Sequence, residues 1–141
     1  MTGALLKAAV PVLPVSGIER AASFYAERLG FEIGHTDSGY AVMIRDKIEI
    51  HLWCATDETW KGRDGHPVIS GAESFLAGTA SARVFTTEID ALFAEMRDKD
   101  VIHPNGPLQN KPYGLREFAV LDLDGNLLTF FQPFDQKEYR K

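Results

Sequence analysis

The chain has 141 residues, of which 45% are hydrophobic, and its 20 acidic and 15 basic side chains give a formal net charge of −5. This length suits one domain, or two small half-domains that share a core, and the composition is that of a folded protein and not of a disordered one. The acidic balance argues against a nucleic-acid binder, which usually shows a basic face, and favours a cationic partner.

The sequence shows neither a membrane-spanning segment nor a secretory signal peptide. No apolar run approaches the roughly 20 residues of a membrane span, and the first fifteen residues lack the apolar core and cleavage site of a signal peptide. We therefore expect a cytoplasmic protein without a membrane partner. The single cysteine, Cys54, cannot form an internal disulfide and is expected to be a small core residue.

The first half of the chain predicts the element order βαβββ. An apolar run from Lys7 to Pro14 is the first strand. Ser16 and Glu19 have the spacing of a capping box, in which each side chain binds the backbone amide of the other residue, so a helix is expected to begin there and to end at Gly30. Three further strands are expected at 31–36, 40–45 and 47–54.

The same order returns after a connection rich in Gly, Asp and Ser. A strand at 79–86 precedes a helix whose apolar stripe runs from Ile89 to Met96, with Thr87 as its expected cap. A weak strand is expected within 101–107. The last two strands, 117–122 and 127–132, are joined through Asp124 and Gly125, a hairpin signal because glycine adopts positive φ without steric cost.

Neither βαβββ unit is large enough to bury its sheet alone, so the two units are expected to pack as a pair around a shared cleft. We predict an α+β fold made of two βαβββ modules within one domain, residues 1–141. Module 1 spans about 5–56, the connector about 57–78 and module 2 about 79–134.

Two motifs carry a resemblance to a known family. The run Phe24-Tyr25-x-x-x-Leu29-Gly30-Phe31 and the later Asp122-Leu-Asp-Gly-Asn126 resemble the vicinal oxygen chelate (VOC) superfamily, which includes glyoxalase I, extradiol dioxygenases, fosfomycin-resistance enzymes and bleomycin-resistance proteins. The segments Ala9-Val-Pro-Val-Leu13 and 112–126 are similar to the bleomycin-resistance proteins in particular. The chain departs from their pattern by inserting Leu115 and by carrying Leu123 in place of proline.

Enzymes of this superfamily hold a divalent metal with His, Gln or Glu side chains on their strands. The corresponding positions here, 8–10 and 79–81, offer no such side chain, and Thr129 stands where the last strand usually has Glu. Glu49 and His51 share one face of a strand, but two ligands do not make a strong metal site. We therefore expect no catalytic residue, metal or cofactor. A metal-dependent dioxygenase, lyase or thiol transferase using Glu49 and His51 is the alternative.

The resemblance implies binding without chemistry. A homodimer would sequester a cationic glycopeptide antibiotic of the bleomycin family in clefts between its subunits, with flat rings on aromatic side chains and a cationic tail near acidic ones. An accessory domain whose cleft meets a protein is a third possibility. The ligand-binding residues expected on this basis are Tyr40, Glu49, His51, Trp53, Trp60, Phe85, Tyr113 and Glu117.

Charge and assembly leave two questions open at this level. Arg83 would repel a cationic drug unless an acidic side chain pairs with it, and Glu117 is one candidate partner, beside Glu49 and Asp37. Arg116 and Glu117 are neighbours on a strand, so at most one of them faces the cleft. Family members commonly pass their first strand to the partner subunit, so we expect a two-fold dimer with possible exchange of the N-terminal strand.

Overall fold

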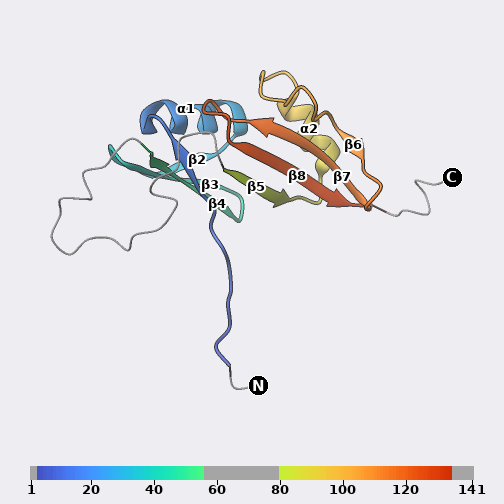
Figure 1. Ribbon diagram of the computed structural model, residues 1–141, viewed down its shortest axis with the longest axis horizontal. Helices are drawn as coiled ribbons and strands as arrows, with labels where there is room; N and C mark the ends of the chain where they lie inside the picture. Colours follow the sequence, from blue (N-terminus) through green and yellow to red (C-terminus); the bar gives the residue numbers. More distant parts are fainter. Residues whose placement is uncertain (1–2, 56–79, 135–141) are drawn as a thin grey trace.

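The computed structural model describes residues 3–55 and 80–134, and it contains two βαβββ modules (Figure 1). Module 1 comprises β1 (Val12–Val15), α1 (Ile18–Leu29), β2 (Glu32–Thr36), β3 (Tyr40–Arg45) and β4 (Ile48–Cys54). Module 2 comprises β5 (Ser81–Phe85), α2 (Ile89–Met96), β6 (Gln109–Asn110), β7 (Leu115–Leu121) and β8 (Leu127–Pro133). The predicted α+β class and the repeated βαβββ order are confirmed.

The two modules have the same sheet topology. Sheet 1 has the strand order β1-β4-β3-β2 and sheet 2 has the order β5-β8-β7-β6. In each sheet the first strand of the module lies parallel to the last one, and the remaining neighbours are antiparallel. Since β1 and β5 each have one paired neighbour in these sheets, both are edge strands.

Each helix covers one face of its own sheet. In sheet 1 the fully buried side chains of Met43, Ile50 and Leu52 alternate along their strands with more exposed ones, as period-two alternation requires. Both helices lie along the same side of the molecule (Figure 1). The uncovered side chains form the open face of sheet 1 (Tyr40, Val42, Ile44, Glu49, His51, Trp53) and the open face of sheet 2 (Arg83, Phe85, Glu117, Ala119, Thr129, Phe131).

The turn between β7 and β8 joins the two modules. Asn126 is completely buried and donates from Nδ2 to the carbonyl of Pro14 at 2.8 Å. The hydroxyl of Tyr25 donates to Asp122 Oδ2 at 2.9 Å, and Ser16 donates to Asp124 Oδ1 from its amide at 3.0 Å and its hydroxyl at 2.6 Å. Gly125 has the positive φ, 89°, expected for the Asp-Gly corner of a hairpin. The same turn therefore also anchors module 2 to module 1.

Both predicted N-terminal helix caps are wrong, whereas the predicted C-terminal stop is confirmed. The residue before α1 is Gly17, without a side-chain cap, because the Ser16 hydroxyl is bound to Asp124 and not to Glu19. The residue before α2 is Glu88, also without a side-chain cap. The hydroxyl that accepts a hydrogen bond near this helix start belongs to Thr86 and not to Thr87, and its donor is the amide of Glu88 at 3.1 Å. Gly30 has the left-handed φ of 77° that ends α1.

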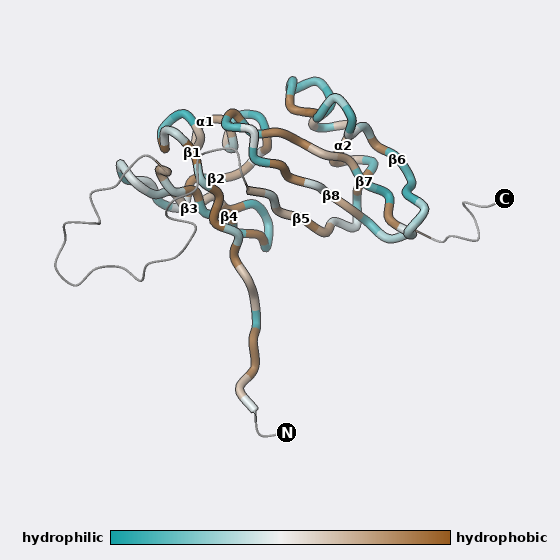
Figure 2. Tube along the Cα trace, in the orientation of Figure 1, coloured by the Kyte–Doolittle hydropathy of each residue, from teal (hydrophilic) through white to brown (hydrophobic). Residues whose placement is uncertain are grey.

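Two predicted strands are placed differently. The run from Lys7 to Pro11 is not part of a strand, and β1 begins at Val12. Residues 3–11 extend away from the body of the molecule (Figure 1), and the hydropathy colours of Figure 2 show that this arm is largely hydrophobic. The weak strand expected within 101–107 is an isolated bridge between Ile102 and Val120, and the short strand β6 follows it.

No helix within residues 3–55 and 80–134 is long and apolar enough to cross a membrane.

Candidate ligand-binding surfaces

The open face of sheet 1 brings four predicted residues together. Antiparallel pairing of β3 with β4 sets Tyr40 opposite Trp53 and places His51 next to both. Tyr40 Oη lies 2.6 Å from His51 Nδ1, and His51 Nε2 lies 3.2 Å from Glu49 Oε1. Because a carboxylate only accepts, the Nε2 atom carries a hydrogen, and the Tyr40 hydroxyl is hydrogen-bonded to Nδ1 on the other side of the ring. The result is a hydrogen-bonded row of phenol, imidazole and carboxylate.

This row holds the side chains of Tyr40, His51 and Glu49 in a defined arrangement. Burial, and after it the negative charge of Glu49, raises the pKa of Tyr40 above its ordinary value. The phenol therefore stays protonated at neutral pH and holds the His51 ring edge-to-face, with ring centroids 5.4 Å apart. With Trp53 half-exposed beside it, this face offers aromatic surface and one carboxylate. Trp60, the other predicted tryptophan, lies outside the described residues.

The open face of sheet 2 brings together the three remaining predicted residues. Glu117 is only 8% exposed and accepts two hydrogen bonds, from Tyr113 Oη at 2.6 Å and from Arg83 Nη2 at 2.9 Å. The bond to Glu117, and to a smaller degree burial, raises the pKa of Tyr113. Phe85 lies directly opposite Phe131, with ring centroids 5.8 Å apart.

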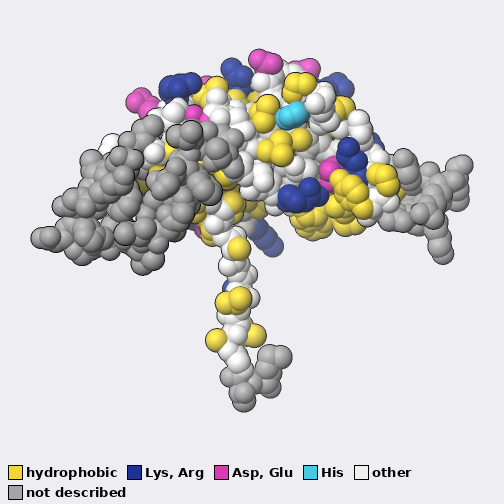
Figure 3. Space-filling view, in the orientation of Figure 1, with side chains coloured by type: hydrophobic (Ala, Val, Ile, Leu, Met, Phe, Trp, Pro, Cys, Tyr) yellow, Lys and Arg dark blue, Asp and Glu magenta, His cyan; other side chains and the backbone are white. Residues whose placement is uncertain are grey.

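Arg83 and Phe131 also lie on this face, although neither was among the predicted ligand-binding residues. The guanidinium of Arg83 lies over the ring of Phe131, with Cζ 5.0 Å from the centroid. Phe131 could have been recognised, because period-two alternation along β8 places it on the same face as Thr129. Figure 3 shows hydrophobic side chains gathered over β5, β7 and β8 next to basic and acidic ones.

The charge questions left open by the sequence are resolved here. The acidic partner of Arg83 is Glu117, and the pair lies on the open face of sheet 2. Arg116 points to the other side of the same sheet and binds Asp90 of α2 at 2.7 Å. Of the neighbouring pair, Glu117 is thus the residue on the open face.

The two groups of predicted residues lie on different sheets. The sheets are held next to one another by the turn 122–126, and their helices cover the same side, so the two open faces also lie next to one another. The sequence predicted a cleft shared by the two modules and drug-binding clefts between subunits; in the single chain the predicted residues lie on two open faces, which we call the two walls.

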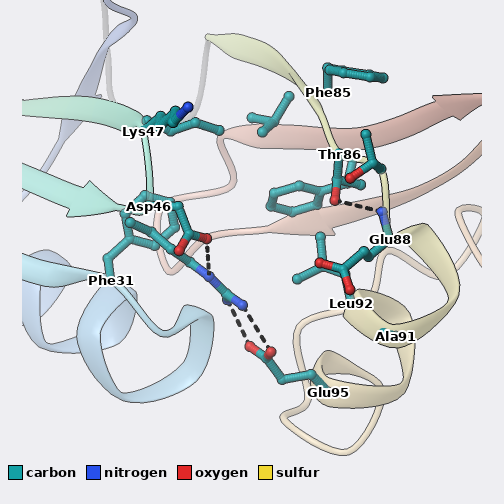
Figure 4. Close-up of a pocket in the computed structure, with 14 residues that line it drawn as sticks. Phe31, Asp46, Lys47, Phe85, Thr86, Glu88, Ala91, Leu92 and Glu95 are labelled. Carbon is teal, nitrogen blue, oxygen red and sulfur yellow. Dashed lines mark hydrogen bonds and ion pairs between the residues drawn. The ribbon is translucent and has the colours of Figure 1, made fainter.

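A pocket of about 730 Å³ lies elsewhere, between the modules (Figure 4). Phe31 and Lys47 line it from module 1, and Leu92 and Glu95 line it from α2. A paired bridge from Arg45 to Glu95, with N–O distances of 2.7 and 2.9 Å, closes one side. Among the predicted ligand-binding residues that the structure describes, Phe85 alone lines this pocket.

The residues that could hold a metal are Glu49 and His51. In the described ranges, 3–55 and 80–134, no group of three or more His, Cys, Asp or Glu side chains is placed to bind a metal ion. Thr129 is nearly buried on the open face of sheet 2 and offers a hydroxyl where the enzymes of the superfamily usually have a carboxylate.

Comparison with known proteins gives the class. The family model described as Glyoxalase/Bleomycin resistance protein/Dioxygenase superfamily matches residues 7–130, and the chain belongs to this superfamily. It is 44% identical, over 87% of its length and 94% of theirs, to proteins named bleomycin resistance protein from Geobacillus stearothermophilus and Staphylococcus aureus. A solved bleomycin-binding protein from bleomycin-producing Streptomyces verticillus, complexed with copper(II)-bleomycin, is 28% identical with a TM-score of 0.68, covering 94% of this chain and 100% of that one.

Proposed function

We propose that the protein binds a cationic glycopeptide antibiotic of the bleomycin family, holds it unchanged and thereby confers resistance to it. The observation that carries this proposal is the 44% identity, spanning 94% of the relative's length, to proteins named bleomycin resistance protein. The fold similarity to a protein solved with copper(II)-bleomycin supports the same ligand class.

The two open faces have the chemistry that such a ligand needs. Tyr40 and Trp53 on sheet 1, and Phe85 and Tyr113 on sheet 2, offer exposed or half-exposed aromatic surface. Each stacked ring contributes on the order of 1 kcal/mol, so several together are needed for tight binding. Glu49 is exposed on sheet 1 and is the carboxylate that we assign to the cationic tail of the drug. Trp60 is retained as a proposed contact on sequence grounds alone.

We further propose that the binding unit is a homodimer. In one chain the two open faces lie next to one another. We propose that a cleft forms where the open face of sheet 1 meets the open face of sheet 2 from a second copy of the chain. Several large apolar side chains, including Val12 and Phe85, are exposed in the single chain and would be covered in this way. The arm of residues 3–11 has the reach and apolar character to cross to the partner subunit. The cytoplasm is the proposed compartment, which suits a chain with a single cysteine.

Calorimetric titration with metal-free bleomycin tests the proposal. We expect saturable binding, with equal numbers of drug molecules and chains and a dissociation constant of about 1 µM or below. Mass spectrometry of the released drug should show an unchanged mass, which distinguishes sequestration from modification. No saturable binding at micromolar drug would contradict the proposal, and so would a drug mass altered by the protein.

The alternative is a metal-dependent enzyme of the same superfamily. A specific observation favours it: the structure brings Glu49 and His51, the two residues it would use, within hydrogen-bonding distance. Elemental analysis of protein purified without chelators separates the two functions. A stoichiometric transition metal that disappears in the variant His51→Ala would favour the enzyme.

A further inference from the structure

Arg83 is held in a defined orientation by two neighbours on the open face of sheet 2. Its Nη2 donates to Glu117 at 2.9 Å, and its guanidinium lies over the Phe131 ring at 5.0 Å. Because a guanidinium is planar and stacks on aromatic faces, these two contacts fix both the position and the tilt of its plane. The side chain is still 49% exposed, so part of this flat group is turned to solvent.

The charge of Arg83 is already compensated. Glu117 is almost buried, and both of its oxygens accept hydrogen bonds, one from Arg83 and one from Tyr113. A carboxylate occupied in this way is a poor counter-ion for a cationic ligand. Glu117 is therefore better described as a positioning residue, which neutralises Arg83 and holds Tyr113 beside it.

We propose that Arg83, backed by Phe131 and held by Glu117, is the planar stacking surface of the sheet 2 wall and selects a flat heteroaromatic group of the ligand. This inference rests on the proposed function, because it names the part of the drug that sheet 2 recognises. It assigns the rings of the ligand to sheet 2 and leaves the cationic tail to Glu49 on sheet 1. Tyr113 and Phe85 flank the same surface.

The substitution Arg83→Lys separates shape from charge. Lysine keeps the positive charge and can still reach Glu117, but it lacks the plane. A stacking role predicts that Arg83→Lys weakens bleomycin binding by about 5-fold to 10-fold, the factor that corresponds to one lost stacking contact. This factor should be the same at low and high salt, because stacking is not screened by ions. A purely ionic role predicts no loss in this variant.

Two further variants test the converse, the loss of positive charge with a flat group retained. One protein carries Glu117→Gln alone, and the other carries both Arg83→Phe and Glu117→Gln. The double variant lacks the positive charge of Arg83 but keeps a flat group at position 83. Stacking predicts dissociation constants within about 2-fold of each other for these two proteins. Arg116→Lys is the matched control, because Arg116 lies next to Glu117 on β7 but binds Asp90 on the covered face. This variant should bind the drug as the wild type does. Unchanged melting temperatures confirm that the variants fold.

The outcomes are distinct. Full binding by Arg83→Lys, or a loss that vanishes at high salt, overturns the stacking role while the proposed function stands. A large loss in the double variant relative to Glu117→Gln also overturns it. If the wild-type protein does not bind bleomycin, both this inference and the proposed function are wrong.

Discussion

Tyr25 shows how one side chain couples the two modules. It is fully buried, and its hydroxyl donates to Asp122 in the turn that follows β7. Burial raises its pKa well above the ordinary value, and the negative charge of Asp122 raises it further. The apolar spacing of α1 predicts that Tyr25 faces the core, but a hydrogen bond to a residue so distant in sequence is not visible in that spacing.

This raised pKa predicts the alkaline stability of the protein. In the folded state the Tyr25 phenol resists ionisation, whereas in the unfolded chain it ionises near its ordinary value of about 10. Its contribution is therefore complete below about pH 10 and is lost as the pH rises further. Tyr25→Phe should lower the free energy of unfolding by about 1 kcal/mol at neutral pH and make its fall above pH 10 shallower.

Urea denaturation at neutral and alkaline pH measures both effects. The alkaline fall should persist in part, because the pKa values of Tyr40 and Tyr113 are raised as well. An alkaline slope in Tyr25→Phe equal to that of the wild type would contradict the assignment.

At the scale of elements, local pattern predicts strands and helix ends unevenly. Alternation located β3 and β4, and Gly30 marked the end of α1, because both depend on residues close in sequence. The capping box failed for the opposite reason: Ser16 has a second acceptor, Asp124, supplied by module 2. Local capping chemistry is reliable when no tertiary partner competes for the same hydroxyl.

Gly30 allows a sharp test of this element. Its φ of 77° disfavours any side chain, and an added Cβ would lie 2.9 Å from Arg45 Nη1, the atom that donates to the Leu29 carbonyl and to Glu95. Gly30→Ala should therefore lower the free energy of unfolding by about 1–2 kcal/mol, through backbone strain and displacement of Arg45. Chemical denaturation of the wild type and the variant measures this loss of free energy of unfolding. Gly3→Ala, where an added Cβ meets nothing within 4 Å, is the control and should change little.

At the scale of the whole molecule, the exposed arm is the strongest structural argument for assembly. Leu5 is 71% exposed and Leu6 is completely exposed, on a segment that leaves the body of its own chain (Figure 2). Exposed apolar side chains in a row are usually covered by a partner. Pro11 lies where the arm meets β1 and limits the backbone at that point.

If the protein forms the proposed dimer, removal of the arm is predicted to weaken it. A chain lacking residues 1–9 should shift from dimer toward monomer in analytical ultracentrifugation, because the apolar contacts of Leu5 and Leu6 are lost. Lys7→Ser in the full chain leaves those side chains in place and should remain dimeric. A wild-type protein that is monomeric at micromolar concentration, or a truncated one that dimerises equally well, would contradict the proposed exchange.

The sequence by itself determined the repeated βαβββ order, the shared face of Glu49 and His51, and the absence of metal-binding side chains at the superfamily's usual positions. These features depend on the spacing of neighbours along the chain, which periodicity reports directly. Only the tertiary structure decided that Glu117 neutralises Arg83, that Phe131 lies beneath it, and that the predicted residues divide between two open faces. Each of these depends on strand register and on how two modules pack, and such contacts join residues whose spacing in the sequence carries no periodic signal.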